Sequence, residues 1–269
     1  MRALLIGGTT FLGPWVARAL VARGLDVAVY HRGEHESPLL PPVRHFHDAR
    51  AGIPVRHIPE DVCDWAPEIV VHMNARNGED TAAAVAAFAG KARRLVLLSS
   101  GDVYRAWDIF LGRDPGPALP GALTETSPLR TRLYPYEGQE YDKILAEQAA
   151  RSDPRLPVVV LRLPKIYGPG SPAPMEDLYA FREHPGWRWT HGHVADAAAA
   201  VALAALHTAA EGETYNVGEL DTPTVGERLA ALAAPDSLPP ADREHNFAQA
   251  IVYDTGKIRR ELEWSEAAR

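Results

Sequence analysis

The chain has 269 residues, of which 46% are hydrophobic and 23% charged, as expected for a globular protein with a sizeable core. Acidic side chains outnumber basic ones by 35 to 28, and the formal net charge of −7 provides no basic field for binding nucleic acid. The single cysteine, Cys63, excludes a disulfide framework and a cysteine-based zinc site.

The sequence also gives no sign of a membrane segment. No apolar run approaches the ~20 residues that cross a bilayer, and the N-terminus leads directly into a predicted strand without a signal peptide. We therefore expect a cytoplasmic protein that binds neither membranes nor nucleic acid.

The first 32 residues have the pattern of a nucleotide-binding βαβ unit. A short apolar strand over 2–6 leads into a glycine-bearing turn, Gly7 to Gly13, and then into a helix that Gly24 ends. A second apolar strand follows over 25–30. Backbone amides of such a turn and the positive end of the helix dipole favour a pyrophosphate, and a glycine at position 13 allows close packing. Thr10 takes the place of the usual middle glycine.

The end of the second predicted strand bears on the choice of dinucleotide. A carboxylate there would bind the ribose 2′-hydroxyl of NAD, but the strand ends in Tyr30, His31, Arg32 and Gly33. His31 and Arg32 could instead meet a 2′-phosphate, which favours NADP over NAD. NAD stays open as the alternative, because Arg32 could equally be a solvated loop residue.

The remaining elements alternate between strand and helix. Further strands are predicted over 43–47, 68–73, 94–98, 158–163 and 213–217. Further helices are predicted over 79–91, 137–151, 197–208, 224–233 and 254–262. Thr224 and Glu227 form a predicted capping box, and Asp254 a predicted cap. Residues 51–67 are expected to be irregular or briefly helical, residues 107–131 to form a loop, and residues 164–170 to turn away from the sheet. This alternation predicts an α/β fold, a Rossmann-like doubly wound parallel sheet.

Candidate catalytic residues follow the central strand over 94–98. Ser99 and Ser100 stand where its carboxyl end is predicted, which is the ligand-binding edge of such a sheet. Tyr136, Tyr141 and Lys143 lie downstream. A hydroxyl, a tyrosine and a lysine beside a nicotinamide can perform acid–base chemistry on a carbinol or carbonyl.

These motifs together resemble those of the extended short-chain dehydrogenases/reductases of the NAD-dependent epimerase/dehydratase kind. The resemblance runs from Leu5 to Trp264. It implies that the turn residues Gly7, Thr9, Thr10, Phe11, Leu12 and Gly13 bind the cofactor, together with His31, Arg32, Asp48, Ala49, Asn74, Ala75, Lys143, Pro164 and Ile166. It further implies that Ser100 bonds the reacting oxygen, that a tyrosine is the acid/base, and that Lys143 positions the ribose and tunes that tyrosine.

The sequence departs from this family at the tyrosine. The family spaces its pair as Y-x-x-x-K, but Gln139 stands four residues before Lys143 and cannot titrate. Tyr136, seven residues before Lys143, would lie roughly 10 Å from it on a continuous helix, unless a bulge or a late helix start brings them together. Tyr141 is expected to point elsewhere. We therefore predict Tyr136 as the acid/base.

The resemblance implies a single unit over 1–269, with 1–165 mainly a dinucleotide-binding core. Residues 166–269 would mainly form a small C-terminal substrate lobe, with core elements returning near 190–217. Trp187 and Trp189 are candidates to line the substrate site in this lobe, although packing is the commoner role of such tryptophans. A homodimer pairing the helices over 79–91 and 137–151 is expected.

Two functions are compatible with these features. The first is an NAD(P)-dependent oxidoreductase, epimerase or dehydratase acting on a small hydroxyl or carbonyl substrate by hydride transfer. The alternative is a catalytically silent dinucleotide-binding sensor or partner-binding protein. No metal site is predicted, because the alternating pairs His45/His47 and His191/His193 are typical of surface or packing residues.

Overall fold

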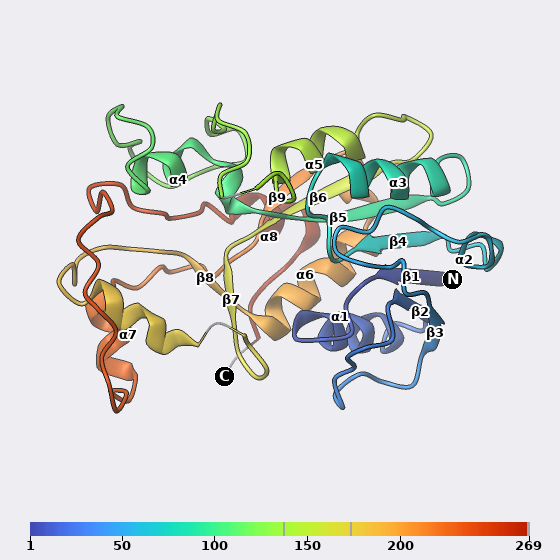
Figure 1. The fold of residues 1–269 in the computed structure, drawn as a ribbon, viewed down its shortest axis with the longest axis horizontal. Helices are drawn as coiled ribbons and strands as arrows, with labels where there is room; N and C mark the ends of the chain where they lie inside the picture. Colours follow the sequence, from blue (N-terminus) through green and yellow to red (C-terminus); the bar gives the residue numbers. More distant parts are fainter. Residues whose placement is uncertain (137, 173, 268–269) are drawn as a thin grey trace.

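A seven-stranded parallel sheet forms the centre of the computed structural model, which describes residues 1–136, 138–172 and 174–267. The strand order is β3-β2-β1-β4-β5-β6-β9, and every neighbouring pair is parallel. The strands are β1 (Arg2–Ile6), β2 (Asp26–His31), β3 (Arg44–His47), β4 (Ile69–His72), β5 (Arg94–Ser100), β6 (Val158–Leu163) and β9 (Thr214–Asn216). The predicted Rossmann-like doubly wound fold is confirmed (Figure 1).

Helices cover both faces of this sheet. In Figure 1, α3 (Gly78–Phe88) and α5 (Lys143–Ala150) lie on one face, and α1 (Leu12–Val21) and α6 (Val194–Leu206) lie on the other. The consecutive residues Leu4 and Leu5 of β1 belong to the two separate cores beneath these layers. Burial on both faces explains why the strands are continuous apolar runs. In the described part of the chain, no helix is both long enough and apolar enough to cross a bilayer.

A third, aromatic core lies beside the sheet. It is built by α4 (Arg105–Phe110) and α7 (Val225–Ala231) with the 3-10 helix over Met175–Phe181, and it includes Phe110, Trp187 and Tyr253. Trp187 is buried and stacks on Phe110 at 4.6 Å between ring centroids, so its role is packing. Because α4 joins this core, chain segments from both sides of residue 165 build it. The predicted division of the chain near 165 stays a prediction.

Several predicted boundaries need correction. Helix α4 occupies the start of the segment predicted as a loop over 107–131, because Ala106, Ile109 and Phe110 are buried in the aromatic core. A strand, β7 (Lys165–Tyr167), pairs with β8 (His191–His193) where only a turn was predicted. The segment over 51–67 contains the short helix α2 (Glu60–Asp64), and the capping box of Thr224 and Glu227 is confirmed.

The last helix starts later than predicted. Helix α8 (Gly256–Leu262) has Thr255 rather than Asp254 at its N-cap, and the Thr255 side chain makes no capping hydrogen bond. The Asp254 carboxylate still accepts a hydrogen bond from the amide of Gly256, at 2.7 Å.

The largest correction concerns the helix predicted over 137–151. Helix α5 begins only at Lys143, and Glu137, its predicted first residue, lies outside the described residues. Asp142 is the N-cap, with extended backbone angles, and its carboxylate accepts hydrogen bonds from the amides of Ile144 and Leu145. Tyr141 therefore precedes the helix, and the helical spacing used to place it does not apply.

Candidate functional site

The glycine turn forms one wall of a cavity at the carboxyl ends of β1 and β4. The strand order reverses between these two strands, which is where open α/β sheets bind ligands. Gly7 has a φ of 77°, in the left-handed region that favours glycine. A Cβ added to Gly13 would lie 1.8 Å from the carbonyl oxygen of Gly8, so only glycine permits this approach of α1 to the turn.

This cavity, of about 430 Å³, brings together most of the predicted cofactor residues. Its lining includes Gly7, Thr9, Thr10, Phe11, Leu12, Gly13, His31, Arg32 and Asn74. The sequence reasoning did not single out the other lining residues, which are Gly8, Gly33, Glu34, His35, Ala51, Ile53, Met73 and Pro172. The turn from β2 into the next loop supplies three of these, at 33–35, directly after the predicted His31 and Arg32.

The other predicted cofactor residues lie outside this lining. They are Asp48, Ala49, Ala75, Lys143, Pro164 and Ile166. The Asp48 carboxylate is paired with the Arg50 guanidinium at 2.8 Å, and Pro164 lines a second cavity. Ala75 follows the lining residue Asn74, and its carbonyl oxygen accepts a hydrogen bond from Lys143.

The predicted phosphate-binding groups already have partners. The Arg32 guanidinium lies 3.1 Å from the Glu34 carboxylate. Burial, with the neighbouring rings of His47 and His45, lowers the pKa of His31 to about 4, so this ring is neutral at physiological pH. Neither residue offers an unpaired positive charge to the cavity.

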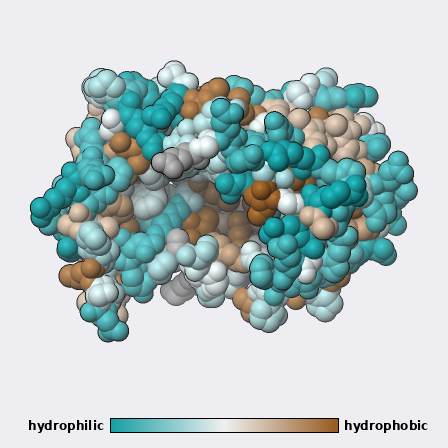
Figure 2. Space-filling model, in the orientation of Figure 1, coloured by the Kyte–Doolittle hydropathy of each residue, from teal (hydrophilic) through white to brown (hydrophobic). Residues whose placement is uncertain are grey.

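A second cavity, of about 480 Å³, holds the candidate catalytic residues. Ser100 and Tyr136 line it, with Asp102 and Tyr141 beside them. Its remaining lining is largely aromatic or aliphatic and consists of Trp107, Phe110, Leu111, Leu163, Pro164, Lys165, Phe181, Trp189, His245 and Tyr253. Trp189, a candidate lining residue from the sequence, is among them. Figure 2 shows that the face of the molecule in view is hollowed near its centre.

Tyr141 lies among these candidate catalytic residues, which corrects the expectation that it points elsewhere. Its hydroxyl donates a hydrogen bond to the Asp102 carboxylate at 2.5 Å. The Lys143 ammonium lies 5.6 Å from the centre of the Tyr141 ring. The extended segment before α5 produces this arrangement, because it places Tyr141 and Lys143 on the same side of the chain.

Tyr136 is placed in the same cavity but at its rim. The residue is 48% exposed, and its ring contacts that of Tyr141 edge-on at 5.4 Å between centroids. Partial burial and the nearby Asp102 carboxylate raise the pKa of Tyr136 to about 12. Burial and the hydrogen-bonded Asp102 raise the pKa of Tyr141 well above its ordinary value, so both hydroxyls are protonated at neutral pH.

Asp102 was not predicted as a site residue from the sequence. Its carboxylate is buried, and this burial raises its pKa. The Asp102 amide donates a hydrogen bond to the Ser100 hydroxyl oxygen at 3.3 Å. The signal in the sequence was an acidic residue two positions after the end of a central strand.

Lys143 lies between segments that border the two cavities, although it lines neither. Its ammonium donates hydrogen bonds to the carbonyl oxygens of Ala75, beside the first cavity, and Leu98, in the strand that ends at Ser100. Burial lowers the pKa of Lys143 to about 8, although the carboxylates of Asp102 and Asp80 oppose this shift.

The depressed pKa of Lys143 predicts a pH dependence of stability. Between pH 8 and 10.5 the unfolded chain holds a proton on Lys143 that the folded chain has lost, so stability rises with pH. Relative to Lys143→Met, the wild type should gain on the order of 3 kcal/mol across this window. Urea unfolding of both proteins at pH 7.5 and pH 10.5 would measure this gain, and an unchanged difference in unfolding free energy between them would contradict the prediction.

A second buried network fixes the strand that carries Ser100. The Arg162 guanidinium pairs with the Glu147 carboxylate at 2.8 Å, and the Ser99 hydroxyl donates to the same carboxylate at 2.6 Å. Arg162, a buried residue of β6, is therefore an ion-pair residue that stabilises the fold.

Comparisons with known proteins bear on the fold. No protein-family model matches the sequence, and no curated protein matches it significantly. Among solved structures, the chain is similar to the UDP-glucose 4-epimerase of Thermotoga maritima crystallised with UDP-glucose, at 17% identity and a TM-score of 0.71, covering 100% of this chain and 94% of the other.

Two further solved structures are similar over the whole chain. The UDP-glucose 4-epimerase of Bifidobacterium longum, in complex with NAD+ and UDP, has 19% identity, a TM-score of 0.74 and coverages of 100% and 94%. A short-chain dehydrogenase/reductase superfamily protein of Agrobacterium tumefaciens with bound NAD has 18% identity, a TM-score of 0.70 and coverages of 100% and 93%. At these identities the likeness establishes the fold.

Proposed function

The chain has the fold of the extended short-chain dehydrogenases/reductases, and from this premise we propose that it is a nicotinamide-dinucleotide-dependent enzyme. It acts on a small hydroxyl or carbonyl compound as an oxidoreductase, epimerase or dehydratase. The observation that carries the proposal is the position of Lys143. Its ammonium donates to the carbonyl oxygen of Ala75, next to the glycine-turn cavity residue Asn74, and lies 5.6 Å from the centre of the Tyr141 ring in the second cavity.

The glycine turn supports the dinucleotide's pyrophosphate, with Asn74 and the residues after β2 around it. Two of the similar structures contain such a dinucleotide: the Bifidobacterium longum epimerase has NAD+ bound, and the Agrobacterium tumefaciens protein has NAD bound. A bound nicotinamide supplies or accepts a hydride. Hydride transfer also requires a group that donates a proton to the reacting oxygen or accepts one from it. Residues of the chain itself supply this group.

We assign the proton transfer to Tyr141 and Asp102. The Tyr141 hydroxyl can donate its proton to a reacting carbonyl oxygen while it takes a proton from the protonated Asp102 carboxyl, so that no tyrosinate is left beside that carboxylate. In the opposite direction, it can take the substrate's hydroxyl proton while passing its own to the Asp102 carboxylate at 2.5 Å. The raised pKa of Asp102 makes that carboxylate a competent acceptor. Ser100 hydrogen-bonds the same reacting oxygen. Tyr136 stays the alternative acid/base.

NAD rather than NADP is the dinucleotide that this geometry favours. The preference for NADP depended on positive charge at His31 and Arg32, but His31 is neutral and Arg32 is paired with Glu34. A 2′-phosphate would have to displace the Glu34 carboxylate, whereas a ribose hydroxyl could bond to it.

The lining of the second cavity indicates an apolar substrate body. The side chains of Trp107, Phe110, Phe181 and Trp189 line this cavity with the proposed catalytic residues.

We also propose the homodimer through α3 and α5 that the family resemblance implies. Sedimentation velocity of the purified chain tests this assembly, and a monomer at micromolar concentration would contradict it.

Calorimetric titration with NADH tests the proposed function. We expect one site per chain and weaker binding of NADPH. Thr10→Glu should weaken NADH binding at least about tenfold, because the exposed Thr10 lines the cavity and a carboxylate there repels the pyrophosphate. Thr131→Glu is the matched control at an exposed threonine that lines neither cavity. No binding to the wild type, or equal binding to both variants, would contradict the proposal.

A further inference from the structure

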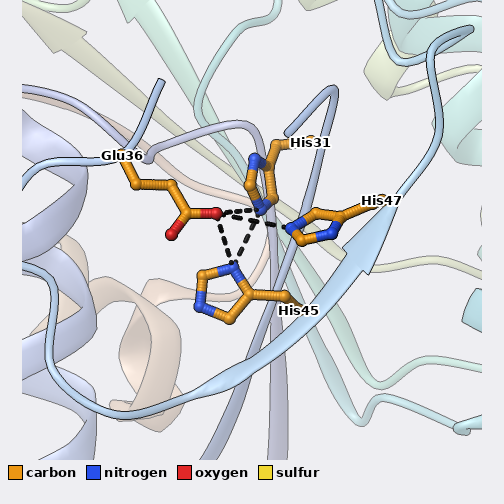
Figure 3. A group of neighbouring side chains, drawn as sticks. All are labelled: His31, Glu36, His45 and His47. Atoms are coloured by element: carbon orange, nitrogen blue, oxygen red, sulfur yellow. Dashed lines mark hydrogen bonds and ion pairs between the residues drawn. The ribbon is translucent and has the colours of Figure 1, made fainter. Parts of the chain in front are cut away.

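Three histidines meet at the edge of the sheet formed by β2 and β3. His31 is the last residue of β2 and lies opposite His47 in the parallel register of the two strands. His45 precedes His47 by two residues in β3, so both side chains lie on the same face of that strand. Glu36, from the loop between the strands, points into the same space (Figure 3).

The ligand atoms of these four residues converge. The Glu36 carboxylate oxygen lies 3.4 Å from His31 Nε2, 3.3 Å from His45 Nδ1 and 3.4 Å from His47 Nε2. His31 Nε2 and His45 Nδ1 are 2.9 Å apart, and all four atoms lie within 4.8 Å of one another.

These separations suit a small tetrahedral ion. Metal–ligand distances of about 2.0–2.1 Å in a tetrahedral site place neighbouring ligand atoms roughly 3.3 Å apart. The three Glu36 distances already have this value, and the His31–His45 contact needs to widen by only a few tenths of an ångström. Three imidazole nitrogens and one carboxylate oxygen form a donor set that zinc prefers.

We propose that His31, Glu36, His45 and His47 bind one divalent transition-metal ion, with zinc as the preferred ion. The site is closed by four protein ligands, so its role is structural: it ties the loop that carries Glu36 to the edge of the sheet. His31 is buried at 5% exposure, whereas the Glu36 and His47 side chains are 42% and 54% exposed and leave a path for the ion.

Binding requires one proton to move. The Gly33 amide donates a hydrogen bond to His31 Nδ1 at 3.1 Å, which places the proton of the neutral ring on Nε2, facing His45. The ion replaces that proton, and the ring then carries it on Nδ1. The Gly33 amide loses its acceptor and turns away, a change that a glycine at a φ of 84° can accommodate.

The test uses the full chain after removal of any affinity tag and dialysis against a chelator. Titration with zinc chloride, followed by calorimetry, should give one ion per chain with a Kd at or below roughly 1 μM. Cobalt(II) alone should give the strong visible bands of a four-coordinate ion. The double variant His45→Gln/His47→Gln should bind zinc at least about 100-fold more weakly, and Glu36→Gln should also bind it more weakly.

A matched control separates this site from adventitious binding. His57→Ala removes an exposed histidine outside the group and should leave the stoichiometry and affinity unchanged. Absence of stoichiometric binding, a six-coordinate cobalt spectrum, or equal zinc binding by wild type and double variant would overturn the proposal. No nucleotide is used, so the result is independent of the proposed enzymatic function.

Discussion

Asp142→Ala is expected to lower the free energy of unfolding by about 3–5 kcal/mol, because it leaves the buried Arg130 guanidinium without its partner. Both side chains of this pair are fully buried, and two hydrogen bonds join them at 2.9 and 3.1 Å. The Asp142 carboxylate also accepts hydrogen bonds from the amides of Tyr134 and Ile144. One substitution thus removes an ion pair and the cap of α5.

An exposed ion pair provides the control for this prediction. The side chains of Glu183 and Arg243 are 43% and 77% exposed, with their charged atoms 3.1 Å apart. Glu183→Ala should leave the free energy of unfolding nearly unchanged, because solvent screens an exposed ion pair. Urea unfolding of both variants makes the comparison, and an Asp142→Ala midpoint equal to that of Glu183→Ala would show that the buried pair does not hold the segment before α5.

Tyr141→Phe is expected to reduce kcat by about 10²–10⁴-fold, because phenylalanine cannot transfer a proton to or from the reacting oxygen. The measurement needs a substrate, which a screen of small alcohols and carbonyl compounds with NAD or NADH would identify. Tyr136→Phe is the matched variant in the same cavity. Its effect should be smaller, since the Tyr136 ring is half exposed at the rim of the cavity, whereas the Tyr141 hydroxyl is hydrogen-bonded to Asp102.

A larger loss of kcat in Tyr136→Phe than in Tyr141→Phe would identify Tyr136 as the acid/base. Asp102→Asn should also lower kcat and should change its pH profile, because the partner that receives the Tyr141 proton is lost. If Tyr141→Phe and Tyr136→Phe both retained full turnover, neither tyrosine would be the proton-transfer group.

The nucleotide-binding half of the fold could be predicted from the sequence because its signals are local. An apolar run, a glycine turn and a helix of matching length lie next to one another, and burial on both faces of the sheet makes each strand recognisable. Gly13 could be assigned to a close approach for the same reason, since the turn and the helix are consecutive.

The position of Tyr141 could not be predicted, because it depends on a residue far from the helix. The sequence pattern extended α5 back to 137, but Asp142 caps it at Lys143 and is held by Arg130, which lies 12 residues earlier. A sequence reader has no local signal for this buried pair. Because of the error in the helix start, Tyr141 was expected to point away from Lys143, and Tyr136 was preferred as the acid/base.

The histidine cluster was missed for a related reason. The alternation of His45 and His47 was visible, but His31 reaches them only through the pairing of β2 with β3, and Glu36 only through the path of a loop. Two histidines two residues apart do not by themselves indicate a metal site, whereas four converging ligand atoms from three segments make the cluster a candidate.

The structure of the complex with NAD is the decisive test of the proposed active site. We expect the pyrophosphate at the glycine turn and the nicotinamide beside Lys143, with its C4 facing Ser100 and the Tyr141 hydroxyl. A nicotinamide directed away from the Ser100 cavity, or an NAD bound outside the glycine turn, would contradict it.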